Sequence, residues 1–184
     1  LALVGGTLKD GAGNDATLTT TEVAATDNSI VVNTAGPEVT AVAITGTDAS
    51  GAAKTDTLVA GDKIVVTATM NEATTVDTAG GFPTYTINVG GVNKTATYVS
   101  GSGSTALVFS YTIVVGDEDI ADGITAGTTA LALNGGTLKD GAGNDATLAT
   151  PEVVAGTNPI VVDMVLEAAA DSSNPENGSY TSTV

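Results

Sequence analysis

Apolar and polar residues alternate along most of the readable part of the chain. Ile64, Val66, Ala68 and Met70 would share one face of an extended segment, with Val and Thr between them. Alternation with a period of two predicts a half-buried β-strand. The same pattern recurs at Val39 to Thr45, at Tyr85, Ile87 and Val89, and at Leu107, Phe109, Tyr111 and Ile113. Gly90-Gly91 between two such runs predicts a tight hairpin.

The predicted fold class is therefore all-β, an antiparallel β-sandwich. The chain is rich in Thr and Val, and only residues 167–170 resemble a short helix. A sandwich also gives the few aromatic residues a place, because aromatic side chains on alternating strands usually pack between two sheets. We expect this core role for Phe82, Tyr85, Tyr98, Phe109 and Tyr111.

Part of the sequence occurs twice. Residues 1–33 return as residues 131–163, with 25 identities in 33 positions. A match this close at a fixed offset is typical of tandem modules. We expect residues 1–36 to be the C-terminal strands of a preceding repeat plus a joint, and residues 37–163 to be one complete module. We expect residues 164–184 to be a polar tail or the start of a further segment.

Composition excludes several functions. The chain has no His, Cys, Arg or Trp, five Lys, and a formal net charge of -16. Imidazole-dependent nucleophiles and Cys/His zinc sites are therefore excluded. Such an acidic chain repels nucleic acid and anionic membrane surfaces, and no apolar run is long enough for membrane insertion. The ligand that it attracts best is a divalent cation bound by oxygen atoms.

The strongest candidate cation site is the acidic loop that follows the last patterned strand. Residues 117–122 contain four carboxylates, which repel one another unless a cation is bound. We expect Asp117, Asp119 and Asp122 to be ligands of Ca²⁺, with loop carbonyls or water completing the shell. The alternative is a solvated acidic loop that prevents edge-to-edge aggregation of the sheet.

A second polar cluster occurs in both copies of the repeat. Asp140 and Asn144 flank a Gly-Ala-Gly sequence, as do Asp10 and Asn14. These residues are further candidate calcium ligands. The same residues also favour a turn, in which Asp and Asn bond the local backbone and Gly supplies a positive φ.

Four segments together resemble bacterial immunoglobulin-like repeats, namely Met70-Asn71-Glu72-Ala73, residues 98–103, residues 116–119 and residues 135–144. Such repeats belong to giant calcium-dependent, RTX-type surface adhesins and to a cyanobacterial cell-surface protein needed for swimming. The resemblance covers residues 1–163. It implies an immunoglobulin-like sandwich repeated as an extracellular spacer at the bacterial surface, with calcium stiffening the joints. The joint here has Asn33 where the family often has Asp, a better calcium ligand.

The family also suggests a role for Glu72, which follows a strand that should end near a joint and so could share an ion with the linker. The predicted function is thus a non-catalytic extender of a cell-surface adhesin, in contact with neighbouring repeats of its chain. The alternative is a module that binds a glycan, a protein or ice directly, through its loops or a Thr-rich face. An enzyme using paired carboxylates is disfavoured because no pair stands out. Residues 1–33 could also pair with another molecule by strand exchange.

Overall fold

The computed structural model describes residues 6–17, 32–55 and 57–164, and the chain divides into two compact units, residues 1–33 and residues 34–184. Each unit is described by itself. The short helical pattern at residues 167–170 and the predicted polar tail lie outside the described residues. Within the described part of the chain there is no helix long and apolar enough to cross a membrane.

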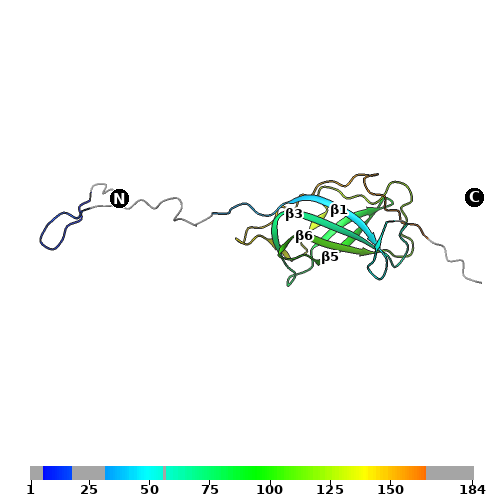
Figure 1. Ribbon diagram of the computed structural model, residues 1–184, viewed down its shortest axis with the longest axis horizontal. Helices are drawn as coiled ribbons and strands as arrows, with labels where there is room; N and C mark the ends of the chain where they lie inside the picture. The colour runs from blue at the N-terminus through cyan, green and yellow to red at the C-terminus, as the bar shows by residue number, and fades with distance from the viewer. Residues whose placement is uncertain (1–5, 18–31, 56, 165–184) are drawn as a thin grey trace, which may run out of the picture. The chain divides into compact units, whose positions relative to one another are not determined.

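The described residues of the second unit form strands and turns without a helix, which confirms the predicted all-β class. The strands are β1 (Val39–Thr47), β2 (Ala53–Lys54), β3 (Lys63–Asp77), β4 (Thr84–Val89), β5 (Val92–Ser100), β6 (Ser104–Thr112), β7 (Leu131–Ala132) and β8 (Thr137–Lys139) (Figure 1). All named pairings are antiparallel, in the order β2-β1-β3-β6-β5-β4-β7, with β8 on β3. The strands surround one hydrophobic core, as in a β-sandwich.

Strand β3 is the longest and connects two parts of the structure. Its first part pairs with β1 and β6, the register shifts between Thr69 and Thr74, and its last three residues pair with β8. The expectation that this strand ends near Glu72 was wrong, because β3 continues to Asp77. An irregularity of this kind bends a strand without ending it, so one strand contributes to two parts of the sheet.

The alternation of apolar residues correctly predicted most of the core. The inward residues of β3, from Ile64 to Met70, are at most 2% exposed. Phe109 lies at the centre of the aromatic packing, with ring centroids 5.7 Å from Tyr85 and 5.8 Å from Tyr98. The prediction for Phe82 was wrong, since this residue is 55% exposed. It precedes β4, in a segment where strand alternation does not apply.

The second copy of the repeat completes the sandwich. β7 adds to β4, β8 adds to the end of β3, and single bridges join Val153 to Ala126 and Val162 to both Leu58 and Asp119. The segment supplies four buried apolar side chains, namely Leu131, Leu138, Ile160 and Val162. Residues 131–163 therefore cover core that the earlier strands leave open.

The two copies contain the same β-hairpin, which we call the repeat hairpin: residues 8–16 in the first copy and 138–146 in the second. In each copy the Lys at the second position bridges to the Asp six residues later. The apolar residue that begins the hairpin differs in its surroundings, because Leu138 is 1% exposed and Leu8 is 50% exposed. The hairpin conformation thus forms with or without a core beneath it.

The chain enters and leaves the second unit at opposite ends of β1. At the proximal end, the amide of Thr147 donates to the carbonyl of Pro37 at 2.8 Å. A Cβ on Gly36 would lie 1.9 Å from the carbonyl oxygen of Asp145, so only glycine permits this approach. At the distal end, the amide of Asp163 donates to Leu58 at 3.0 Å. The repeated segment therefore touches both ends of the module.

The repeat supplies a matched pair of substitutions that tests this account of the core. Leu138→Ala should lower the free energy of unfolding by about 2–5 kcal/mol, because it leaves a cavity in a closed core. Leu8→Ala should change it by less than about 0.5 kcal/mol, because half of that side chain is in solvent. Urea unfolding followed by circular dichroism measures both values. Equal losses in the two variants would contradict the assignment of Leu138 to the core.

Candidate functional site

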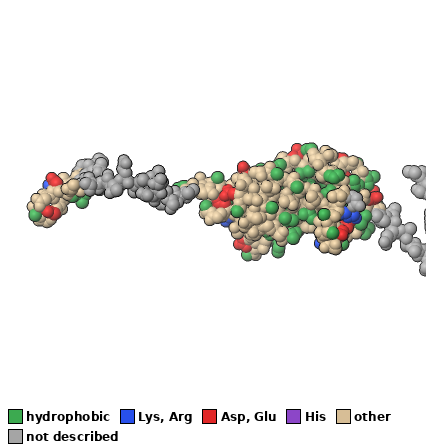
Figure 2. All heavy atoms as spheres, in the orientation of Figure 1, with side chains coloured by type: hydrophobic (Ala, Val, Ile, Leu, Met, Phe, Trp, Pro, Cys, Tyr) green, Lys and Arg blue, Asp and Glu red, His purple; other side chains and the backbone are tan. Residues whose placement is uncertain are grey.

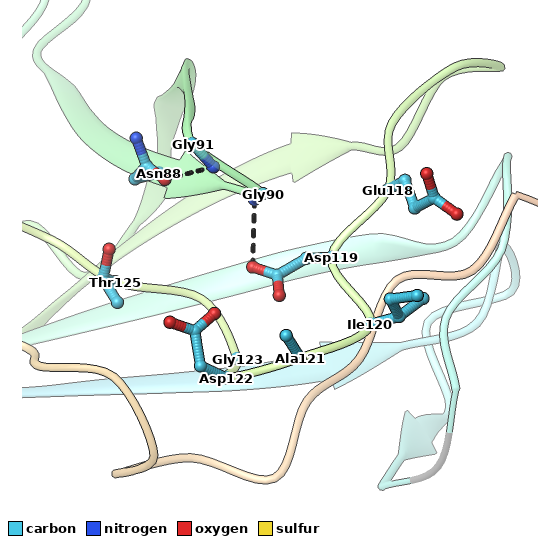
Figure 3. Close-up of a pocket in the computed structure, with 10 residues that line it drawn as sticks. All are labelled: Asn88, Gly90, Gly91, Glu118, Asp119, Ile120, Ala121, Asp122, Gly123 and Thr125. Atoms are coloured by element: carbon cyan, nitrogen blue, oxygen red, sulfur yellow. Dashed lines mark hydrogen bonds between the residues drawn. The ribbon is translucent and has the colours of Figure 1, made fainter.

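A pocket opens at the distal end of the second unit, between the acidic loop and the hairpin that joins β4 to β5 (Figure 3). The loop contributes residues 118–123, and the hairpin contributes Asn88, Gly90 and Gly91, with Thr125 beside them. The charge of the chain is visible on the surface as well, where acidic side chains are more numerous than basic ones (Figure 2).

The double glycine brings the hairpin against the loop. Gly90 and Gly91 have φ of 55° and 87°, values that turn residues without a side chain adopt readily. A Cβ on Gly90 would lie 1.9 Å from the carbonyl oxygen of Glu118, so another residue here would displace the loop. The amide of Gly90 donates to Asp119 Oδ2 at 3.0 Å. This contact places the Asp119 carboxylate on the wall of the pocket.

Asp119 is the buried acid among the residues that line the pocket. The residue is only 4% exposed, and its backbone exchanges two hydrogen bonds with Val162, at 2.7 and 2.8 Å. Its second carboxylate oxygen, Oδ1, is buried without a hydrogen-bond partner. In Figure 3 this oxygen points toward the segment that carries Ala121 and Asp122. A buried carboxylate oxygen without a donor is costly, and a cation is one group that would satisfy it.

The other oxygen atoms of the pocket suit the same kind of ligand. Asp122 and Thr125 line it with a carboxylate and a hydroxyl, and Asn88 adds an amide oxygen, which also accepts from the Gly91 amide at 2.8 Å. The Glu118 side chain points away from this group in Figure 3. Carboxylate, amide and hydroxyl oxygens are ligands of Ca²⁺, and the chain contains no Cys or His that would favour a softer metal ion.

The pocket offers few carboxylate groups as metal ligands. Among the residues that the structure describes, no cluster of three or more His, Cys, Asp or Glu side chains is close enough to hold a metal ion. Asp119 and Asp122 would therefore be the two charged ligands, and carbonyl or water oxygens would complete the six to eight that Ca²⁺ takes.

Asp117, the third predicted ligand of the loop, has other partners. Its Oδ1 lies 2.6 Å from Lys94 Nζ, and its Oδ2 accepts from the Tyr111 hydroxyl at 2.7 Å and from the Val114 amide at 3.0 Å. It is not among the residues that line the pocket. Asp117 thus anchors the start of the loop to β5 and β6, while Asp119 and Asp122 face the pocket.

These contacts determine the protonation state of Asp117, which we call the anchor of the loop. Burial alone would raise the pKa of Asp117, but the hydrogen bonds from Lys94, Val114 and Tyr111 outweigh it and hold the pKa below its ordinary value of 3.8. Burial and the neighbouring carboxylate raise the pKa of Tyr111 to about 12. Asp117 is therefore ionised and Tyr111 protonated throughout the neutral range.

The three remaining predicted ligands lie at the proximal end, away from the pocket. Asp140 Oδ1 accepts from the amides of Ala142 and Asn144 at 2.9 and 2.8 Å, and Asn144 Nδ2 donates to Asp140 Oδ2 at 2.8 Å. These are the bonds of the turn that was the alternative interpretation of this motif. Glu72 is half-buried on β3, and its neighbour Asn71 accepts from the Glu38 amide at 3.0 Å. The structure thus divides the six predicted ligands between two ends of the module.

Sequence reasoning missed Asn88, Lys94 and Thr125. Asn88 had a usable signal, because it lies just before the predicted glycine turn, where Asn often bonds the local backbone. Lys94 had none. Its pairing with Asp117 depends on how β5 is placed relative to the loop, which the spacing of residues does not reveal.

Comparison of the chain with protein-family models, with curated proteins and with solved structures found no match. The function must therefore be inferred from the pocket, the repeat and the composition.

The anchor predicts acid sensitivity. Because the pKa of Asp117 is lower in the folded protein than in the unfolded chain, its contribution is complete above about pH 5 and is lost as the pH falls toward the folded value. Asp117→Asn should destabilise the protein by about 1–3 kcal/mol at pH 7 and flatten the loss of stability between about pH 5 and pH 2. Urea unfolding across this range measures both effects.

Asp145→Asn is the matched control for this experiment, because Asp145 also pairs with a lysine but is 76% exposed. Its cost should be below about 1 kcal/mol, as for other exposed pairs. An Asp117→Asn variant with the same acid response as the unmodified protein would show that Asp117 is not the anchor.

Proposed function

We propose that this protein is a non-catalytic extender module of a large bacterial cell-surface protein, and that Ca²⁺ bound in the distal pocket stiffens the joint to the following segment. The observation that carries the proposal is the position of Asp119. Its side chain has a buried oxygen without a partner, and its backbone is bonded to Val162, where the chain leaves the sandwich. A cation held by Asp119 would restrict the motion of the Asp119 side chain and of the chain at Val162.

The charge distribution supports a cation at this place. Lys94 neutralises Asp117, but none of the ion pairs among the described residues includes Glu118, Asp119 or Asp122. Neighbouring carboxylates without a counter-charge repel one another, and this repulsion grows as they are removed from water. Binding of a divalent cation would convert the repulsion into attraction. The solvated-loop alternative fits Glu118, which is exposed, but it does not explain why Asp119 is buried.

The repeat and the composition support the spacer role. Near-identical modules in series are typical of extended proteins in which each unit contacts its neighbours. The sequence has no His, Cys or Arg, so it lacks imidazole, thiol and guanidinium groups for catalysis, and the pocket offers oxygen atoms suited to holding an ion. The resemblance to bacterial immunoglobulin-like repeats points to the same function and to an extracellular location.

The first test is thermal unfolding across a calcium titration. Calcium at about 100 times its dissociation constant should stabilise the protein by about 2.7 kcal/mol, or roughly 5–10 °C in Tm. In chelator, Asp119→Asn should be at least as stable as the unmodified protein, because the substitution removes a poorly satisfied buried charge. In calcium the order should reverse, since only the unmodified protein binds the ion.

Glu118→Gln is the matched control, because it removes one charge from the same loop at a side chain that points away from the pocket. It should keep the calcium response, and Asp122→Asn should weaken it. If calcium leaves the Tm of the unmodified protein unchanged, the distal site is wrong, and the acidic loop is a solvated edge.

Stiffening of the joint can be measured separately from stability. The Val162 amide donates to the carbonyl of Asp119, so its hydrogen exchange reports opening of the chain exit. Calcium should slow this exchange by about tenfold or more in the unmodified protein and leave it unchanged in Asp119→Asn. Calcium binding that raises the Tm without slowing exchange at Val162 would support a metal site but contradict its role at the joint.

A further inference from the structure

The two copies of the repeated segment lie in different surroundings. Leu138 and Val162 of the second copy are 1% and 0% exposed, whereas their counterparts Leu8 and Val32 are 50% and 80% exposed. Burying such side chains is favourable by about 1.5–3 kcal/mol each. Leu8 and Val32 therefore present to solvent apolar side chains whose counterparts in the second copy pack against the sandwich.

The first copy is also partly organised for binding. Its repeat hairpin is closed by a hydrogen bond from the Ala16 amide to the Leu8 carbonyl at 2.8 Å, and the corresponding bond from Ala146 to Leu138 measures 2.9 Å. A segment that already has its bound conformation loses less conformational entropy on binding. The hairpin would thus need no local rearrangement to take the place of its copy.

We propose that residues 1–33 of one molecule replace residues 131–163 on the sandwich of a second copy of this chain. The acceptor surface consists of the end of β3, which pairs with β8, and the start of β4, which pairs with β7. The internal repeat identifies the occupant, because 25 of 33 residues are those that the surface already binds. This proposal does not depend on the cation site.

One difference between the copies determines which of them binds the sandwich more strongly. Asn134 has a φ of 50°, and its side-chain amide donates to Thr84 Oγ1 at 2.7 Å and to the Phe82 carbonyl at 3.3 Å. The corresponding residue in the first copy is Val4. A β-branched residue is strained at positive φ, and Val has no donor for these acceptors. The molecule's own segment is therefore preferred, and exchange requires that this segment first be displaced.

Cysteine cross-linking gives a direct test, because the chain has no cysteine of its own. Thr75 is the register partner of Lys139, so in the exchanged form it would lie opposite Lys9. After unfolding and refolding at high concentration, Thr75→Cys with Lys9→Cys should give a disulfide-linked dimer whose yield rises with concentration. Thr75→Cys with Lys139→Cys is the control and should link within one molecule.

Peptide mapping should place the disulfide of the dimer between positions 9 and 75. The yield of this dimer should exceed the dimer yield of either single-cysteine variant. A linkage within one molecule, or a yield no higher than the single variants give, would overturn the proposal. Adding Val4→Asn should raise the association constant by about tenfold, because it removes the strain at positive φ. No increase would show that the first copy does not occupy the place of residues 131–163.

Displacement of the internal segment gives a second test in the full chain. Leu138→Asp places a charge in the core and should shift the protein from monomer to dimer in light scattering, with a Tm that rises with concentration. Adding Leu8→Asp should abolish the dimer. If Leu138→Asp leaves the protein unfolded at every concentration, cross-linking decides. A dimer that persists with Leu8→Asp would overturn the proposal.

Discussion

The structure depends above all on the closure of its sheet by a segment from the end of the module. β1 to β6 bring apolar side chains together, but two places on the sheet remain unpaired until β7 and β8 arrive. Because an open edge and an uncovered core both favour association, the position of residues 131–163 decides whether the module is self-contained. Both ends of the module depend on the same segment, which touches Pro37 at one end and Leu58 at the other.

The distal pocket follows from this closure. Val162 holds the backbone of Asp119, and the turn at Gly90 holds its side chain, so the carboxylate is fixed before any ligand binds. Asp117, two residues earlier, is satisfied by Lys94 and Tyr111. One loop thus contains a neutralised acid that anchors it and a poorly satisfied acid that faces the pocket. The difference lies in their partners, since both residues are 4% exposed.

The sequence predicts the fold better than it predicts the site, for a physical reason. Strand alternation is local, so the inward residues of β3 and the turn at Gly90 can be recognised without knowing the topology. The exposure of Phe82 and the continuation of β3 beyond Glu72 depend on where the sheet bends, which is a tertiary property. The roles of Asp117 and Asp119 likewise depend on segments distant in sequence. Spacing could group these acids but could not separate them.

Near-identity between the two copies of the repeated segment has a consequence for pairing. The first copy closely resembles the segment that completes the sandwich. A small number of substitutions at conformationally demanding positions would preserve the common fold while favouring the correct pairing. Asn134 occupies such a position, because its positive φ and its two acceptors select against the Val of the first copy. One of the eight differences in 33 positions, Val4 against Asn134, can therefore carry pairing information.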